Sequence, residues 1–309
     1  MITINTDKGL TRLESWDDVL TRPGFKTDVD PKSTKLDRII GNYNLATYHP
    51  CGLSVCRTLH GKGYLVVTRD GHETNIGKDC GKKYFDVAFT SMEKVFQKDL
   101  RNKERREALS AFQNRIPSVE TKVQDLLEGT HGAKWINKQI RFLVDPLKGL
   151  PSPVTAIVNG LVRRRTGTLT RARATTPEER ERLRAQGSTR RDDRYVDEVV
   201  GQLDGISALY PENNLRDLLV SGMDLLGVIK TADVDNLKDK SLRDLAKWII
   251  SVDPTIARAE ETIEAGRRLL TKNNLQQLLA FVDTKPDRRT FNAYLADLPE
   301  AYATLSVAA

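Results

Sequence analysis

The distribution of cysteine and histidine constrains this 309-residue chain more than any other feature of its sequence. All three cysteines and three of the four histidines lie within residues 49–80, about a tenth of the chain, and only His131 lies elsewhere. An odd number of cysteines does not suit a disulfide framework, whereas thiol and imidazole groups gathered in one stretch are typical of a metal site. We therefore expect a metal ion to organise this stretch.

Zinc is the metal that this set of side chains favours. It takes four nitrogen or sulfur ligands in a tetrahedron, and a closed shell of four protein ligands is structural, with no open position for water. The expected ligands are Cys51, Cys56, His60 and Cys80. His72, after the expected hairpin turn, and His49, before Pro50, are the alternatives for the histidine position. The competing interpretation is that the cysteines are ordinary small buried side chains.

A β-hairpin is expected between the two groups of ligands. Residues 64–68 are rich in aromatic and β-branched side chains, Asp70-Gly71 favours a type I′ turn, and residues 73–76 can return as the second strand. A helical pattern begins near Cys80. The last sulfur is therefore expected close to a helix N-terminus, where the helix dipole and the exposed amides favour a thiolate.

Paired ligands, a hairpin and a Gly-x-x-Cys-Gly that enters a helix together resemble a treble-clef or zinc-ribbon-like finger. The resemblance covers about residues 45 to 90 and implies a structural zinc ion. Treble clefs usually place two ligands at the helix start, whereas Cys80 stands alone here. The phrases CGLSVCRTLHGKGYLV and ETNIGKDCGKKYF are also similar to uncharacterised proteins carried by phages and prophages.

The expected fold is mostly α, with a small β-hairpin zinc module followed by a multi-helix body, because apolar residues recur at helical spacing through most of the chain. Five segments are expected. They are an N-terminal extension packed on the finger or the body (1–48), the zinc-binding module (49–85), a helical segment (86–162), an arginine-rich arm or linker (163–194) and a C-terminal helical bundle (195–309).

Local signals predict several helix ends in this scheme. Ser15 is expected to cap a short helix, and Thr176, followed by proline and two glutamates, to cap another. Pro117 is expected to start a new helix, and Pro146 to follow the end of the next one. Helical spacing resumes at Tyr195.

The net charge of +7 is concentrated in one segment. Residues 163–194 hold 11 arginines, five acidic residues and no lysine, so this segment alone supplies most of the excess. The guanidinium group can hold phosphate through two hydrogen bonds, which makes these side chains the best candidates for contact with nucleic acid. The candidates are Arg163, Arg164, Arg165, Arg171 and Arg173, with a second basic patch at Lys78, Lys82 and Lys83 beside the last cysteine.

The expected function is that of a zinc-containing, non-enzymatic protein that associates with DNA or RNA through arginine and lysine contacts to phosphate. The alternative is a protein-binding adaptor or inhibitor whose arginines meet an acidic protein surface, including a phage factor that acts on a host or anti-phage defence complex. An enzyme is the third possibility. His72 and Asn75 on the hairpin faintly resemble a ββα-metal nuclease, but the following helix lacks histidine. The sequence also lacks a phosphate loop, a nucleophile elbow and His-Glu-x-x-His.

A cytoplasmic location, in the host cytoplasm if the protein is phage-encoded, is expected with no membrane partner. The first residues contain no basic stretch followed by an apolar one, and no run of about 18 uncharged apolar residues occurs in the sequence.

Overall fold

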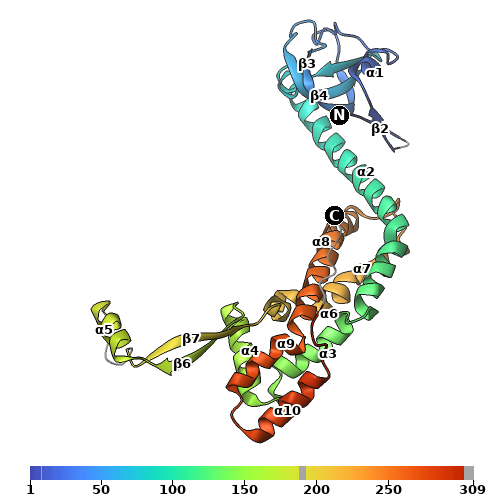
Figure 1. Ribbon diagram of the computed structural model, residues 1–309. Coiled ribbons are helices and arrows are strands. Elements are labelled where there is room, and N and C mark those ends of the chain that lie inside the picture. Colours follow the sequence, from blue (N-terminus) through green and yellow to red (C-terminus); the bar gives the residue numbers. More distant parts are fainter. Residues whose placement is uncertain (8, 188–192, 303–309) are drawn as a thin grey trace. The chain divides into compact units, whose positions relative to one another are not determined.

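A computed structural model describes residues 1–7, 9–187 and 193–302 of the chain. The described residues form a five-stranded antiparallel sheet near the N-terminus and a mostly helical remainder that carries a two-stranded ribbon (Figure 1). The chain divides into two compact units, one from Met1–Gln113 and Ala232–Lys247, the other from Asn114–Thr231 and Trp248–Ala309. The expectation of a mostly α protein with a β module ahead of a helical body is confirmed at this level.

The sheet of the first unit has the strand order β2-β1-β3-β4-β5. Its strands are β1 (Ile2–Thr6), β2 (Gly9–Leu13), β3 (Leu36–Pro50), β4 (Leu59–Thr68) and β5 (Glu73–Ile76). Residues 1–48, expected to be an extension packed on a finger, therefore supply two strands and most of a third within the same sheet. The only pattern that marks β1 is the alternation of Ile2 and Ile4, which are both buried.

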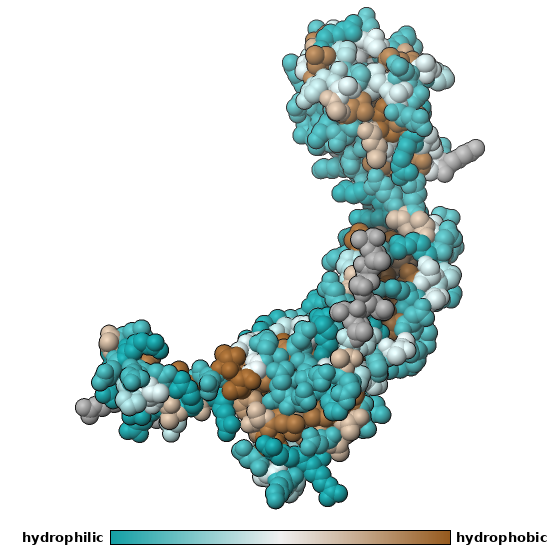
Figure 2. Space-filling model, viewed as in Figure 1, coloured by the Kyte–Doolittle hydropathy of each residue, from teal (hydrophilic) through white to brown (hydrophobic). Residues whose placement is uncertain are grey.

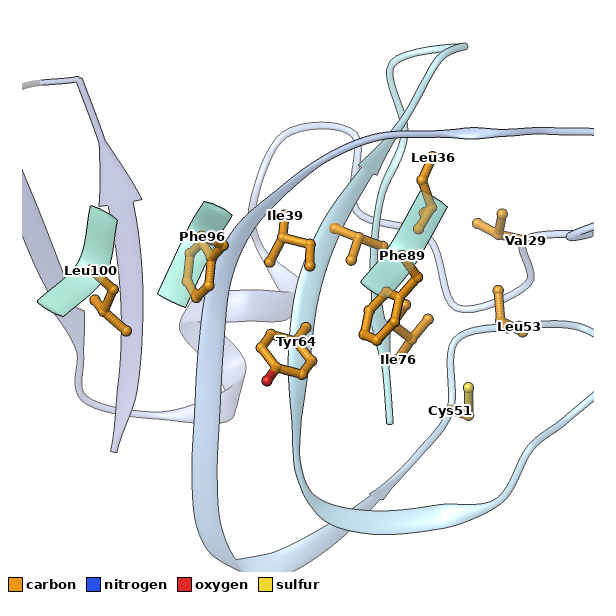
Figure 3. Close-up of a cluster of buried hydrophobic side chains, with 11 residues drawn as sticks. Val29, Leu36, Ile39, Cys51, Leu53, Tyr64, Ile76, Phe89, Phe96 and Leu100 are labelled. Carbon is orange, nitrogen blue, oxygen red and sulfur yellow. The ribbon is translucent and has the colours of Figure 1, made fainter. Parts of the chain in front are cut away.

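Apolar side chains cover both faces of this sheet. Along β4, Tyr64 and Val66 point into a cluster that includes Phe89 of the following helix, as Figure 3 shows in part. Leu65 and Val67 point into a second cluster on the opposite face, built mainly from β1 and β3. Because β4 is buried on both faces, it reads as a continuous apolar run in the sequence.

The expected β4–β5 hairpin is confirmed, with a different turn. Tyr64 pairs with Ile76 and Val67 with Glu73, and the amide of Thr68 donates to the carbonyl of His72 at 2.9 Å. Three residues, 69–71, therefore connect the strands, with Gly71 at φ +87°. This is the three-residue loop that ends in a left-handed glycine, and the expected two-residue type I′ turn is wrong.

Helix α2 (Lys78–Glu128) follows β5 directly. Its backbone kinks at Asp86, where φ is 45° and ψ is −123°. The new helix expected at Pro117 is wrong, because α2 continues through this residue. The hydroxyl of Ser118 donates to the carbonyl of Arg115 at 2.7 Å, and the apolar stripe continues on both sides of the proline, with Ile116 and Val119 buried. Packing of that stripe offsets the cost of a proline inside a helix.

The remaining helical elements are mostly short. The α-helices are α1 (Trp16–Leu20), α3 (Ala133–Val144), α4 (Ser152–Arg164), α5 (Pro177–Ala185), α6 (Leu215–Leu219), α7 (Leu225–Lys230), α8 (Asp239–Leu269), α9 (Lys272–Leu275) and α10 (Lys285–Ala296). The 3₁₀ turns are η1 (Pro146–Lys148), η2 (Ile206–Leu209), η3 (Pro211–Asn213), η4 (Ser221–Met223) and η5 (Gln276–Phe281). Over the described part of the chain, every helix is too short or too polar to cross a membrane.

The sequence signals for helix ends are confirmed in three places. Ser15 caps α1 and Thr176 caps α5, each in a reciprocal capping box with an acidic residue three positions later. Helix α3 ends at Val144, immediately before Asp145-Pro146.

The segment after residue 163 differs from the expected arm and helix. Strands β6 (Thr168–Ala174) and β7 (Tyr195–Gln202) pair as an antiparallel ribbon. The helix expected from Tyr195 is therefore wrong. Val196, Val199 and Val200 fit helical spacing, but these β-branched side chains favour a strand, and β6 supplies the partner. Val199 pairs with Thr170 and Gly201 pairs with Leu169, so Val200 is the extra residue of a β-bulge.

Candidate metal centre

The loop from Cys51 to Cys56 is held by backbone hydrogen bonds from both sides. Cys51 follows the last residue of β3, and its amide donates to the carbonyl of Thr58 at 2.9 Å. The amide of Gly52 donates to the carbonyl of Asn75 in β5 at 2.8 Å. On the other side, the amide of Ser54 donates to the carbonyl of Val29 at 3.0 Å. These contacts fix the position of both thiols against the hairpin.

The structure brings the three cysteines together. Cys80 lies in the first turn of α2, and the Sγ atoms of Cys51, Cys56 and Cys80 all lie within 4.8 Å of one another. The Sγ atoms of Cys56 and Cys80 are 3.1 Å apart, and all three residues are free thiols. Tetrahedral zinc with Zn–S bonds of about 2.3 Å separates its sulfur ligands by about 3.8 Å. The Cys56–Cys80 edge is shorter than this spacing, and all three sulfurs lie close enough for small shifts to bring them to it.

His60 lies beside this triangle but outside the 4.8 Å group. Its Nδ1 is 2.8 Å from the hydroxyl of Tyr43. Its Nε2 is the one buried side-chain nitrogen or oxygen among the described residues that has no hydrogen-bond partner. The ring lies against Gly77, where an added Cβ would be 3.4 Å from Nε2. Burial lowers the pKa of His60, which favours the neutral imidazole that binds metals.

The two alternative histidines make other contacts. The ring of His49 stacks on Trp16 with ring centroids 4.1 Å apart, and its Nε2 lies 3.2 Å from Thr47 Oγ1. His72 Nε2 is 2.9 Å from Lys26 Nζ and 3.6 Å from the carboxylate of Asp70. All three rings lie outside the group of sulfurs, but only His60 has a buried ring nitrogen without a hydrogen-bond partner, so it is the best candidate for the fourth side chain.

The thiols differ in how easily they ionise. Burial raises the pKa of Cys51, and burial together with the neighbouring sulfurs raises the pKa of Cys80 to about 12. Burial also opposes ionisation of Cys56, but hydrogen bonds from the side chain and backbone of Thr58 and from the other two thiols outweigh it and lower the pKa to about 7. Burial and the neighbouring sulfurs therefore oppose the thiolate that the helix start is expected to favour at Cys80. A bound dication would reverse this order, since a thiol that coordinates a metal loses its proton.

A buried network orients the His60 ring. The side-chain amide of Asn75 donates to the carbonyl of Pro50 at 2.9 Å and to the hydroxyl of Tyr43 at 3.4 Å. An added Cβ at Gly63 would lie 2.4 Å from that hydroxyl, so the glycine makes room for it. Asn75 is buried and thus has a structural role. The sequence offers no local signal for Tyr43, which reaches His60 only because β3 pairs with β4.

The three lysines beside Cys80 divide into one paired and two exposed residues. Lys78 Nζ lies 2.7 Å from Glu93, and the same carboxylate accepts the hydroxyl proton of Tyr64 at 2.7 Å. Lys82 and Lys83 are exposed. The charge of Lys78 is therefore neutralised within the fold.

The five predicted arginines divide in the same way. Arg165 pairs with Glu212 at 2.7 Å and lies over the ring of Tyr210, 4.7 Å from its centroid. Arg173 holds both carboxylate oxygens of Glu179, at 2.6 and 2.8 Å. The other three arginines, Arg163, Arg164 and Arg171, are exposed and have no acidic partner within ion-pairing distance among the described residues.

Comparison with known proteins adds no relative: the chain matches no family model, no curated protein and no solved structure.

Proposed function

We propose that residues 45–90 form a zinc-stabilised module of treble-clef-like construction, with the three cysteines and His60 as the four ligands. The observation that supports this most directly is the unpaired, buried Nε2 of His60 beside three clustered thiols. An unpaired buried polar atom costs about 1–3 kcal/mol, and coordination to a metal would remove that cost. With four protein ligands the ion has no position for water, so its role is structural.

We further propose that the protein associates with nucleic acid by contacting phosphates. The supporting observation is the group of exposed arginines where α4 meets β6. Arg163 and Arg164, together with Thr170, line a hollow of about 280 Å³ between the end of the helix and the start of the strand. A two-stranded ribbon fits the major groove of a duplex, and Arg171 lies on this ribbon.

Fluorescence anisotropy of labelled single- and double-stranded DNA and RNA at two salt concentrations tests this proposal. The triple variant R163A/R164A/R171A should bind more weakly and reduce the slope of log K against log salt by up to about 3. The control K285A/R289A removes two exposed cations of α10 and should leave the slope unchanged. An unaltered slope in the triple variant would exclude these arginines, and no binding at low salt would reject the proposal.

Protein binding is the second candidate, as an adaptor or inhibitor, and one feature of the ribbon favours it. Figure 2 shows a mostly hydrophilic surface on this part of the molecule, with a few apolar side chains among the polar ones. Tyr195 and Val199 of β7 are each 65% exposed. Their partners Ala174 and Thr170 place both on the same face of the ribbon. Loss of a protein partner by Y195S/V199S, with nucleic-acid affinity unchanged, would favour this candidate.

A further inference from the structure

A hollow of about 490 Å³ opens on the second unit, and none of the arginines of α4 and β6 lines it. Side chains from the end of α2, from α3, from η1 and from α6 and its C-terminus line it. They are Leu127, Lys134, Asn137, Lys138, Arg141, Phe142, Lys148, Arg216 and Val220. Five of these nine residues are cationic and none is acidic. The volume is within the range of about 300–1,000 Å³ typical of small-molecule sites.

The periodicity of α3 explains how its cations reach one side. Lys134, Lys138 and Arg141 follow one another at spacings of four and three residues, so they share a face of the helix. The opposite face carries Ile136 and Leu143, which are fully buried. Burial of that face fixes the rotation of α3 and leaves its basic side turned toward the hollow.

Most of these charges lack a counter-ion within the described part of the protein. Lys134 forms an ion pair with Glu128. Lys138, Arg141 and the two cations from η1 and α6, Lys148 and Arg216, have no acidic side chain within ion-pairing distance in residues 1–7, 9–187 and 193–302. Like charges that converge without a counter-ion repel one another and raise the local affinity for anions. The hollow therefore has the electrostatic character of an anion site.

The hollow also has an apolar part, which a ligand would have to match. Leu127 and Phe142 are half-buried, and Val220 is 46% exposed, so three apolar side chains lie among the cations. Asn137 offers both a donor and an acceptor from one amide group. A simple inorganic anion would use the cations alone, whereas an anion with a flat apolar part would use the whole lining.

We propose that this hollow binds a nucleotide. The phosphates contact Lys138, Arg141 and Arg216, and the base packs on Phe142 with its polar edge toward Asn137. Bases pack on aromatic side chains irrespective of sequence, and arginine holds phosphate oxygens in pairs. The site uses none of the arginines assigned above to nucleic-acid contact, so it goes beyond that proposal and stands independently of it.

A neighbouring hollow distinguishes two forms in which the nucleotide could be bound, a free nucleotide and part of a single strand. It has a volume of about 630 Å³ and shares Asn137, Arg141 and Arg216 with the first. Its lining adds Tyr210, a second aromatic surface. A free nucleotide would occupy the first hollow alone, whereas a single strand would continue into the second.

Titration calorimetry with ATP, inorganic phosphate and oligothymidylates of two to eight nucleotides tests the inference on the full chain. The variant K138A/R141A should weaken binding of ATP or oligonucleotide about tenfold or more, and F142A should weaken both without changing phosphate binding. The control K285A/R289A loses the same charge outside the hollow and should bind like the parent protein. Affinity that rises with length along the oligothymidylate series identifies a strand, whereas ATP affinity equal to that of the longest oligonucleotide identifies a free nucleotide.

Two results would overturn the site. One is the absence of binding by ATP and by every oligonucleotide at low salt. The other is equal weakening by K138A/R141A and by its control. The variant R163A/R164A/R171A, measured in parallel, separates failure of this site from failure of the ribbon arginines, because the two sets share no residue.

Discussion

The hydroxyl of Tyr43 lies 2.8 Å from Nδ1 of His60, and Nε2 of the same ring is buried without a partner. Histidines that bind a metal through one nitrogen are usually held by a hydrogen bond at the other. Tyr43 is almost fully buried, and burial raises its pKa, so its hydroxyl stays neutral as the partner of the ring. The hydrogen bond from Tyr43 therefore fixes the ring and leaves Nε2 as its free nitrogen.

Removing this hydroxyl should weaken zinc binding while leaving the ligands intact. Y43F is expected to lower zinc affinity about 10- to 100-fold, the usual effect of losing a group that orients a metal ligand. Competition with a chromogenic chelator measures this change. Y48F is the matched control, since Tyr48 lies on the same strand but is 69% exposed. Equal affinity in the two variants would contradict the role given to Tyr43.

Loss of a ligand should release the metal and unfold the module. C56S and C80S are expected to reduce zinc content from one ion per chain to none and to lower the melting temperature, because metal binding contributes directly to folding in small zinc modules. H60A should do the same. H49A and H72A are the controls and should keep the ion. Elemental analysis with thermal scans measures both properties, and one zinc ion per chain with unchanged stability in C80S would reject the site.

The sequence predicts the grouping of the three cysteines better than it predicts the sheet around them. Clustering identified the cysteines, and the β4–β5 hairpin with a following helix explains why Cys56 and Cys80 meet. The N-terminal strands were not predicted because β1 spans only five residues and gains its stability from pairing with β3. In this pairing Ile4 lies opposite Gly41 and Ile2 opposite Tyr43, so the partners are 37 to 41 residues apart in the sequence. The ribbon strand β7 escaped prediction because its valines also fit a helical period.

Charge pairing was beyond the reach of the sequence for a related reason. The arginine-rich segment identifies a basic region, but it does not reveal that Glu212 neutralises Arg165, which lies 47 positions earlier. Conversely, Lys138, Arg141 and Arg216 belong to no basic run, and only the packing of α3 beside α6 brings them together. The fold determines which charges are paired and which cations lie together, and the order of residues in the sequence does not reveal it.

Close packing at the start of α2 makes a prediction about stability. An added Cβ at Gly81 would lie 2.5 Å from the ring of Phe89, which is fully buried. G81A should therefore destabilise the protein by about 1–3 kcal/mol through overpacking. In α7, Gly227 has no atom within 4 Å of an added Cβ, so G227A should be neutral or stabilise by about 0.5–1 kcal/mol. Urea unfolding measures both changes, and a harmless G81A would show that Phe89 can move.

Glu93 should make the first unit sensitive to acid. Burial alone would raise the pKa of this carboxyl, but the hydrogen bonds from Lys78 and Tyr64 outweigh burial and hold the pKa below its ordinary value of 4.5. A carboxyl with a lowered pKa stabilises the folded state fully above its unfolded pKa, and this contribution is lost as the pH falls through the folded pKa. The parent protein should therefore lose stability more steeply below pH 4.5 than E93Q does. Zinc release affects both proteins alike, so the difference between their urea midpoints from pH 7 to pH 3 isolates the carboxylate. Parallel curves would mean that Glu93 titrates at its ordinary pKa and that its contacts with Lys78 and Tyr64 add nothing to stability.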